Sequence, residues 1–107
     1  MNTSIKIELE NGKNLTIDLA KEDLSWDVVE TDEREMGVER LYEASFEKEV
    51  ENLKDPLIIT LRVWEYPEGI ANMQEIEAMG FKVIEECDLG QFVITYFDED
   101  EDFGKDI

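Results

Sequence analysis

Residues 57–66 constrain the fold of this chain more than any other stretch. Their side chains alternate with the two-residue period of a β-strand, and most are the β-branched and aromatic types that strands favour. Ile58 and Trp64 give the second face apolar groups as well. A strand that is apolar on both faces is typical of a sheet interior covered on each side. We therefore predict a central strand at 57–66, with Trp64 packed against a helix.

The N-terminal segment predicts a β-hairpin whose register can be derived. A two-residue Asn-Gly turn would set apolar residues opposite polar ones on the same face, because a slip of one residue moves every side chain to the other side. A three-residue loop at 10–12, with Gly12 in the left-handed conformation, removes this conflict. The predicted register then pairs Ile7 with Leu15 and Ile5 with Ile17.

Alternating patterns predict further strands, and one stretch predicts a helix. The helix is expected near 70–79, where Ile70, Met73 and Ile76 recur at spacings of three. Residues 39–50 fit two structures, because the alternation of apolar and polar residues favours a strand while the residue types are good helix formers. The further strands are expected at residues 24–31, 42–46, 81–87 and 91–97, with a long hairpin loop at 32–40.

Taken together, these elements predict an α+β domain that is mainly β. The connections are short, so most strands are expected to pair with their neighbours in the chain. We expect an antiparallel sheet of about seven strands, with the helix near 70–79 packed on it. Because 91–97 is also apolar on both faces, it is expected to lie beside 57–66. Residues 1–97 form a single domain in this prediction, and 98–107 form an acidic, mobile C-terminal tail.

The charge of the chain limits its partners. Its 107 residues include 29 Asp and Glu against 10 Lys and Arg, giving a net charge of -19. Nucleic acids and anionic membrane surfaces require a positive face, so direct binding to either is not expected. The charge is compatible with a basic protein partner, or with an acidic surface that serves solubility alone. The oligomeric state stays open.

The sequence carries few groups suited to catalysis. The absence of histidine excludes Ser-His and Cys-His pairs, and Cys87 lies among acidic residues that disfavour a thiolate. The spacing Asp98-x-Asp100-x-Asp102 matches the start of a calcium loop, but Phe103 occupies the position that needs glycine. We therefore predict no catalytic residue, no metal site and no cofactor, although catalysis by carboxylates alone remains an alternative. A single cysteine and no recognisable signal peptide or membrane span favour a cytoplasmic protein.

Two loops are predicted to carry a contact surface. Tyr66 and Glu68 stand where the central strand ends in a turn, and loops on a rigid sheet commonly carry recognition. Glu33, Arg34 and Met36 form the second candidate, at the expected tip of a hairpin. For each residue an ordinary solvated turn is the alternative.

The leading functional hypothesis is a non-enzymatic, acidic protein-binding domain that acts on a basic partner. Inhibitors, immunity proteins and nucleic-acid mimics work in this way, because complementary charge speeds association and a few aromatic residues supply binding energy. One alternative is a domain that binds a small molecule or a divalent cation in a pocket of converging carboxylates. Another is a structural or assembly domain that pairs through a sheet edge.

Overall fold

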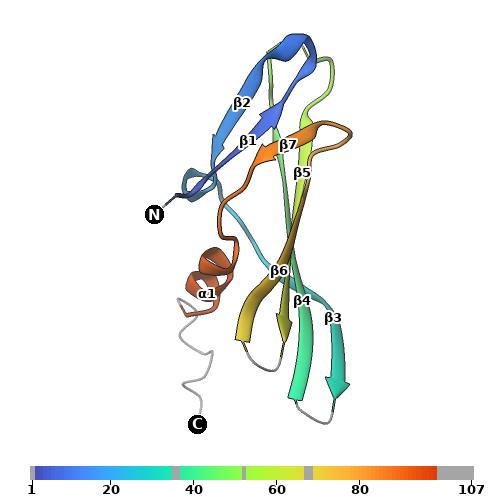
Figure 1. The fold of residues 1–107 in the computed structure, drawn as a ribbon, viewed down its shortest axis with the longest axis vertical. Coiled ribbons are helices and arrows are strands. Elements are labelled where there is room, and N and C mark those ends of the chain that lie inside the picture. The colour runs from blue at the N-terminus through green and yellow to red at the C-terminus, as the bar shows by residue number, and fades with distance from the viewer. Residues whose placement is uncertain (1, 35–36, 52, 67–68, 99–107) are drawn as a thin grey trace.

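The part of the chain that the structure describes folds into seven antiparallel strands and one α-helix, which confirms the predicted mainly β, α+β class (Figure 1). The fold is seen in a computed structural model, which describes residues 2–34, 37–51, 53–66 and 69–98. The strands form two sheets rather than one, in the orders β2-β1-β7 and β3-β4-β5-β6. The elements are β1 (Ser4–Glu8), β2 (Asn14–Asp18), β3 (Asp27–Arg34), β4 (Gly37–Lys48), β5 (Leu57–Tyr66), β6 (Gly69–Glu77), β7 (Lys82–Glu85) and α1 (Gly90–Asp98), with short 3-10 turns at Glu10–Gly12 and Leu19–Lys21.

The small sheet has the register that the sequence predicts. Ile5 lies opposite Ile17 and Ile7 opposite Leu15. Gly12 has a φ of 73°, the left-handed conformation that the three-residue loop requires. β7 pairs antiparallel with the other edge of β1 and confirms a strand within 81–87.

The large sheet is built around β5, whose bounds confirm the predicted central strand. β4 and β6 flank it, so the open question about 39–50 is answered in favour of a strand. Alternation decides it, because Tyr42 and Ala44 are buried on one face while Ser45 lies exposed on the other. β3 begins at Asp27 rather than Leu24, and β3 and β4 continue through much of the region expected to be a loop.

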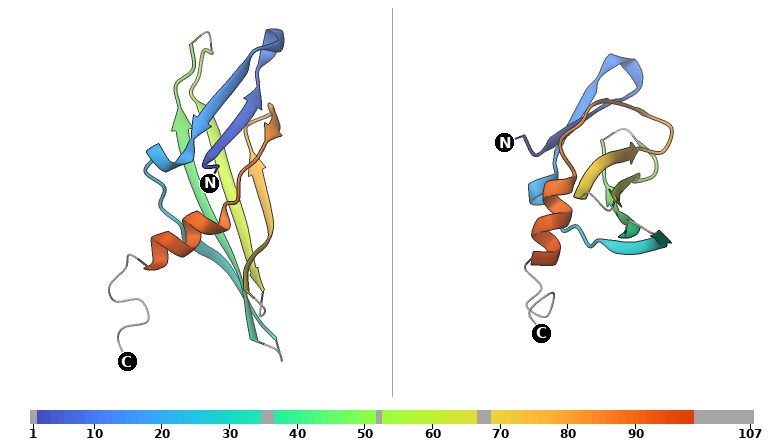
Figure 2. Two further views of the ribbon diagram at one scale, coloured as in Figure 1. Left: turned by 60° about the vertical axis from the view of Figure 1, so that its left-hand side comes forward. Right: turned by 60° about the horizontal axis from the view of Figure 1, so that its bottom comes forward.

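The core lies on one side of the large sheet, which we call the inner face. Figure 2 shows the small sheet and α1 on this same side. β5 contributes four side chains that are at most 2% exposed, and these belong to one buried cluster with residues of the small sheet and α1. The largest side chains of this cluster that are at most 2% exposed are Ile5, Ile7, Ile17, Leu19, Leu57, Ile59, Leu61, Val63, Leu89 and Val93.

The expectation that β5 is covered on both faces is wrong. Ile58 is 38% exposed, whereas its neighbour Ile59 is fully buried. Trp64 shares the open face with Ile58, because both alternate with the buried residues of the strand. Trp64 therefore does not pack against a helix at 70–79. We call this side of the large sheet the outer face.

The helix predicted near 70–79 is wrong, because these residues form most of strand β6. The spacing of three between Met73 and Ile76 places them on opposite faces of a strand. Met73 pairs with Trp64 on the outer face and is 53% exposed, while Ile76 pairs with Leu61 and packs against the core. A register irregularity between Trp64 and Glu65 interrupts simple alternation in β6, and this produced the misleading pattern.

The strand predicted at 91–97 is also wrong, because these residues lie in α1. Leu89 and Val93 are four residues apart and both fully buried, so the apolar side of the helix starts just before its first residue. The carboxylate of Asp88 accepts a hydrogen bond from the amide of Gly90 at 3.0 Å, which satisfies a free amide at the helix start. The neighbours of β5 are therefore β4 and β6, not residues 91–97.

The side chain of Gln74 connects α1 to the large sheet. Its amide nitrogen donates to the carbonyl of Cys87 and to the carboxylate of Glu86, each at 2.8 Å. Its amide oxygen accepts a hydrogen bond from the amide of Leu89 at 2.9 Å. One side chain on β6 thus fixes the segment that joins β7 to α1.

Among the described residues, no helix is long and apolar enough to cross a membrane.

Candidate binding face

The two predicted contact surfaces lie at the same end of the large sheet. The β3–β4 and β5–β6 hairpins both end there, as Figure 1 shows at the bottom of the view. Glu33 is exposed and lies opposite Val38, in a strand rather than in a loop. Arg34 is the last residue of β3 and Tyr66 is the last residue of β5. The structure describes their backbones, and their side chains lie outside its described part. Glu68 and Met36 also lie outside the described residues.

The outer face presents carboxylates over most of its length. Directly opposed residues of an antiparallel pair share a face, so the register assigns each side chain to one side of the sheet. Among the residues of this face whose side chains the structure describes, Arg62 is the one basic residue. The acidic positions of the outer face are Asp27, Glu30, Asp32, Glu39, Glu43, Glu47, Glu75 and Glu77.

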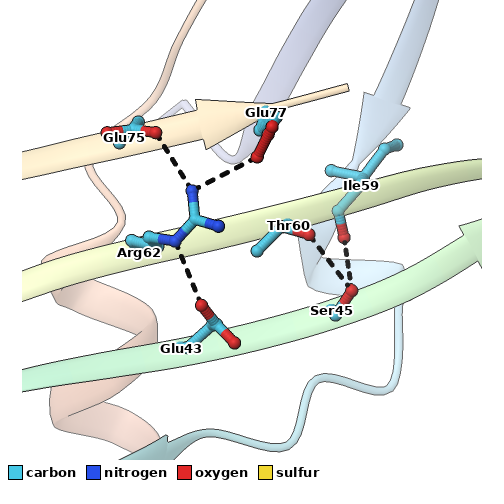
Figure 3. Close-up of polar contacts among 7 residues, drawn as sticks. All are labelled: Glu43, Ser45, Ile59, Thr60, Arg62, Glu75 and Glu77. Atoms are coloured by element: carbon cyan, nitrogen blue, oxygen red, sulfur yellow. Dashed lines mark hydrogen bonds and ion pairs between the residues drawn. The ribbon is translucent and has the colours of Figure 1, made fainter. Parts of the chain in front are cut away.

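Arg62 lies in the middle of this face and contacts three carboxylates (Figure 3). Its Nε donates to Glu43 at 3.0 Å, and its Nη1 donates to Glu75 at 3.0 Å and to Glu77 at 3.4 Å. Partial burial alone would lower the pKa of Arg62, but the hydrogen bonds to Glu43 and Glu77 outweigh it and raise the pKa above its usual value. The cation stays charged and holds the three strands together, while the cluster keeps an excess of negative charge.

A row of apolar side chains crosses the outer face beside the Arg62 cluster. Leu41, Trp64 and Met73 lie opposite one another on β4, β5 and β6. Leu41 and Trp64 are partly exposed and Met73 is 53% exposed. We call these three residues the apolar row. A neighbouring row on the other side of Arg62 is polar, where the hydroxyl of Ser45 lies 3.3 Å from that of Thr60 (Figure 3).

Carboxylates border the apolar row on both sides. Glu43 and Glu75 lie on one side of it, next to Arg62, and Glu39 lies on the other side, towards the end of the β3–β4 hairpin. Glu30 of β3 extends the same row, since it lies opposite Leu41. The apolar row is therefore a small apolar patch bordered by negative charge, which is the composition expected of an interface centre with a charged rim.

A second polar cluster lies on the inner face, near the same end of the sheet. A carboxylate oxygen of Glu65 accepts hydrogen bonds from Arg40 and from the hydroxyl of Tyr42, each at 2.9 Å. Tyr42 is 5% exposed. Burial first, and then the hydrogen bond to Glu65, raise the pKa of Tyr42 from 10.0 to about 12. The phenol is therefore a structural hydrogen-bond donor at neutral pH.

This cluster predicts a loss of stability in alkaline solution. Because the folded pKa of Tyr42 is raised, its contribution to stability is present below pH 10 and is lost as the pH rises to about 12. A difference of two pKa units corresponds to a loss on the order of 2 kcal/mol. We expect the unfolding free energy of the wild type, minus that of Tyr42→Phe, to fall by this amount across the window. Urea titrations at each pH measure it, and a difference that stays constant with pH would contradict the assignment.

The remaining reactive groups are poorly placed for chemistry. Burial, together with the charges of Asp88 and Glu86, raises the pKa of the Cys87 thiol, so the thiolate is disfavoured. Within the described parts of the chain, no three Cys, Asp or Glu side chains are grouped to hold a metal ion. An open groove of about 450 Å³ runs between residues 19–26 and α1. Its Glu22 carboxylate is held by Lys48 at 2.6 Å.

Sequence reasoning singled out residues at one end of the large sheet but missed the apolar row. Trp64 was expected to be structural, and Leu41 and Met73 were not singled out. The alternation in 57–66 does place Trp64 opposite the buried residues, so the sequence contained part of the signal. Comparison of the chain with family models, curated proteins and solved structures gives no significant match.

Proposed function

We propose that this protein is a non-enzymatic binding domain that receives a basic protein partner on the outer face of its large sheet. The observation that carries the proposal is the apolar row of Leu41, Trp64 and Met73, exposed within a border of carboxylates. Inhibitors, immunity proteins and nucleic-acid mimics of this kind bind through acidic faces. The partner's basic residues would contact the border while its apolar residues cover the row.

The charges favour such a partner over other occupants. A net charge of -19 attracts a basic protein from a distance and raises its association rate. The same charge repels a second copy of the chain, so the apolar row is a poor site for self-association. Trp64 is the natural energetic centre, because tryptophan is enriched among the residues that dominate binding energy and it lies on the middle strand of the row.

The groove beside α1 is the site that the small-molecule alternative would require. Trp26 and Leu19 form part of its lining, but they are at most 3% exposed and present little apolar surface to a ligand. Of its two acidic groups, Glu22 already pairs with Lys48 and Asp23 is exposed. The carboxylates do not converge there, so the outer face is the better-supported site.

The test is an affinity capture with matched variants. The immobilised wild type, Trp64→Ala and Met73→Gln are each exposed to a lysate of the producing cells at about 0.05 M and about 0.5 M salt. We expect the wild type to retain a basic protein at low salt and to release it at high salt. The purified partner should bind both variants roughly tenfold more weakly or worse, because each removes part of the apolar row.

Met79→Gln is the matched control, because Met79 is 56% exposed but lies outside the large sheet, after β6. It makes the same chemical change as Met73→Gln without touching the outer face. Equal weakening by Met73→Gln and Met79→Gln would argue against the outer face. If no basic protein is retained at low salt, the proposed function is wrong.

A further inference from the structure

Among the described residues, the edge strand β3 pairs with β4 and with no other strand. It stands at the end of the large sheet, and none of its backbone hydrogen bonds among the described residues reaches a segment other than β4. Every described side chain from Asp27 to Glu33 is exposed, so neither face of this strand is covered. Figures 1 and 2 show β3 apart from the small sheet and α1. An edge with unpaired backbone groups is a ready template for another strand.

The opposite edge of the large sheet belongs to β6, which has nine residues, whereas the edges of the small sheet are shorter. β6, at the opposite end of the large sheet, is tied through Gln74 to the segment that precedes α1. The free edges of the small sheet belong to β2 and β7, which have five and four residues, whereas β3 has eight. Of the two long edges of the large sheet we take that of β3, whose described side chains from Asp27 to Glu33 are all exposed.

The side chains of β3 determine which residue types an added strand should carry. Asp27, Glu30, Asp32 and Glu33 give it a strongly acidic character on both faces. Like charges on adjacent strands repel, so a second copy of β3 would be disfavoured, whereas lysine or arginine side chains would be attracted. Near its start, Val28 and Val29 are 45% and 47% exposed, and they offer an apolar contact to the same strand.

A bulge limits the region that an added strand would use. The register shifts between Val28 and Glu30, which leaves Val29 without a direct partner on β4. From Glu30 onwards the pairing with β4 is continuous to Arg34. This regular part carries most of the acidic side chains of the strand and leads to the end of the sheet where the predicted contact residues lie.

We propose that the free edge of β3 binds an extended basic segment of the partner, in which lysine or arginine alternates with apolar residues, as an additional antiparallel or parallel strand. This inference rests on the proposed function for the basic character of the partner, but it assigns the contact to a different surface. Backbone hydrogen bonds would supply affinity, and the alternating side chains would supply selectivity. The added strand would continue the acidic outer face beyond β3.

The experiment uses two capped peptides and the isotope-labelled protein. In the first peptide lysine alternates with valine; the second has the same sequence but is N-methylated at two adjacent central residues, which blocks both of its edges. At about 0.05 M salt, the first peptide should slow hydrogen exchange roughly tenfold at alternate amides between Glu30 and Arg34. The methylated peptide should bind roughly tenfold more weakly, although its charge is unchanged.

Two charge-matched protein variants complete the test. The double variant Glu30→Lys with Glu33→Lys should bind the first peptide roughly tenfold more weakly. The control, Glu10→Lys with Asp23→Lys, changes the net charge equally at exposed sites outside the strands and should retain most of the affinity.

Three results would overturn the assignment of β3: no binding of the first peptide at low salt, equal binding of the two peptides, or unchanged exchange in β3 while a peptide is bound. These results leave the outcome of the capture experiment on Trp64 and Met73 unchanged, so failure of the β3 assignment can be distinguished from failure of the proposed function. A change in binding at the outer face would not by itself protect alternate amides of β3, so this pattern of protection is specific to binding at the strand edge.

Discussion

Replacing Ile59 by alanine is expected to lower the free energy of unfolding by about 2–5 kcal/mol, whereas the same change at Ile58 should cost about 1 kcal/mol. The two residues are neighbours of the same type on β5. Ile59 is fully buried in the core and Ile58 is 38% exposed on the outer face. The cost at Ile59 includes lost apolar burial and the cavity that remains. The cost at Ile58 is mainly the weaker strand preference of alanine.

Urea unfolding at constant salt measures both changes, because guanidinium would itself screen the large net charge. The m-value should stay unchanged, since both variants expose nearly the same surface on unfolding. The comparison cancels the effect of strand propensity, which is common to the two sites. Equal losses at Ile58 and Ile59 would mean that the outer face is covered in solution, and the proposed binding face would then be unavailable.

This pair of isoleucines also marks the limit of what the sequence predicts. Alternation located β5 and its bounds, because a strand leaves a two-residue period wherever its faces differ. It did not show which face another element covers, since Ile58 and Trp64 make the outer face apolar as well. That property depends on where the small sheet and α1 pack, which is a tertiary choice.

An element was predicted correctly where residues close together in the chain were enough to determine its structure. The β1–β2 register followed from neighbouring residues alone, because only one loop length aligned Ile7 with Leu15. Residues 91–97 form a short apolar run, and such a run fits a strand or a buried helix equally well by periodicity. The structure distinguishes the two by the burial of Leu89 together with Val93, which lie at helical spacing.

The candidate site was less predictable than the fold for a related reason. The Arg62 cluster joins residues that are 19 and 13 positions apart in the chain, so it exists only in one register of three strands. The apolar row has the same origin, because Leu41, Trp64 and Met73 become neighbours only when β4, β5 and β6 are aligned. The end of β5 was easier to identify, since Pro67 follows it in the sequence itself.

Replacing Gln74 by leucine is expected to lower the free energy of unfolding by about 2–3 kcal/mol. Leucine is close to glutamine in size but forms none of its hydrogen bonds to Glu86, Cys87 and Leu89. The loss exceeds that of an ordinary surface bond because the amide of Leu89 and the carbonyl of Cys87 would remain partly buried without this partner. Leu89 is itself fully buried at the start of α1.

Gln91→Leu is the matched control for this substitution. The Gln91 amide donates to the carbonyls of Asp88 and Asn2 at 2.9 and 3.3 Å, and both bonds are exposed, so water replaces them readily. We expect its cost to stay within about 0.5 kcal/mol. Urea unfolding compares the two variants, and equal costs would show that the Gln74 amide does not hold the segment.

Hydrogen exchange separates a local effect of Gln74→Leu from a global one. If Gln74 specifically secures the junction before α1, exchange at Leu89 and Val93 should accelerate more than exchange in β1 and β5. Leu89 loses its direct acceptor, while Val93 bonds to the carbonyl of Leu89 and depends on its position. Uniform acceleration throughout the protein would instead show that α1 and the sheets open as one cooperative unit, with Gln74 contributing only to its overall stability.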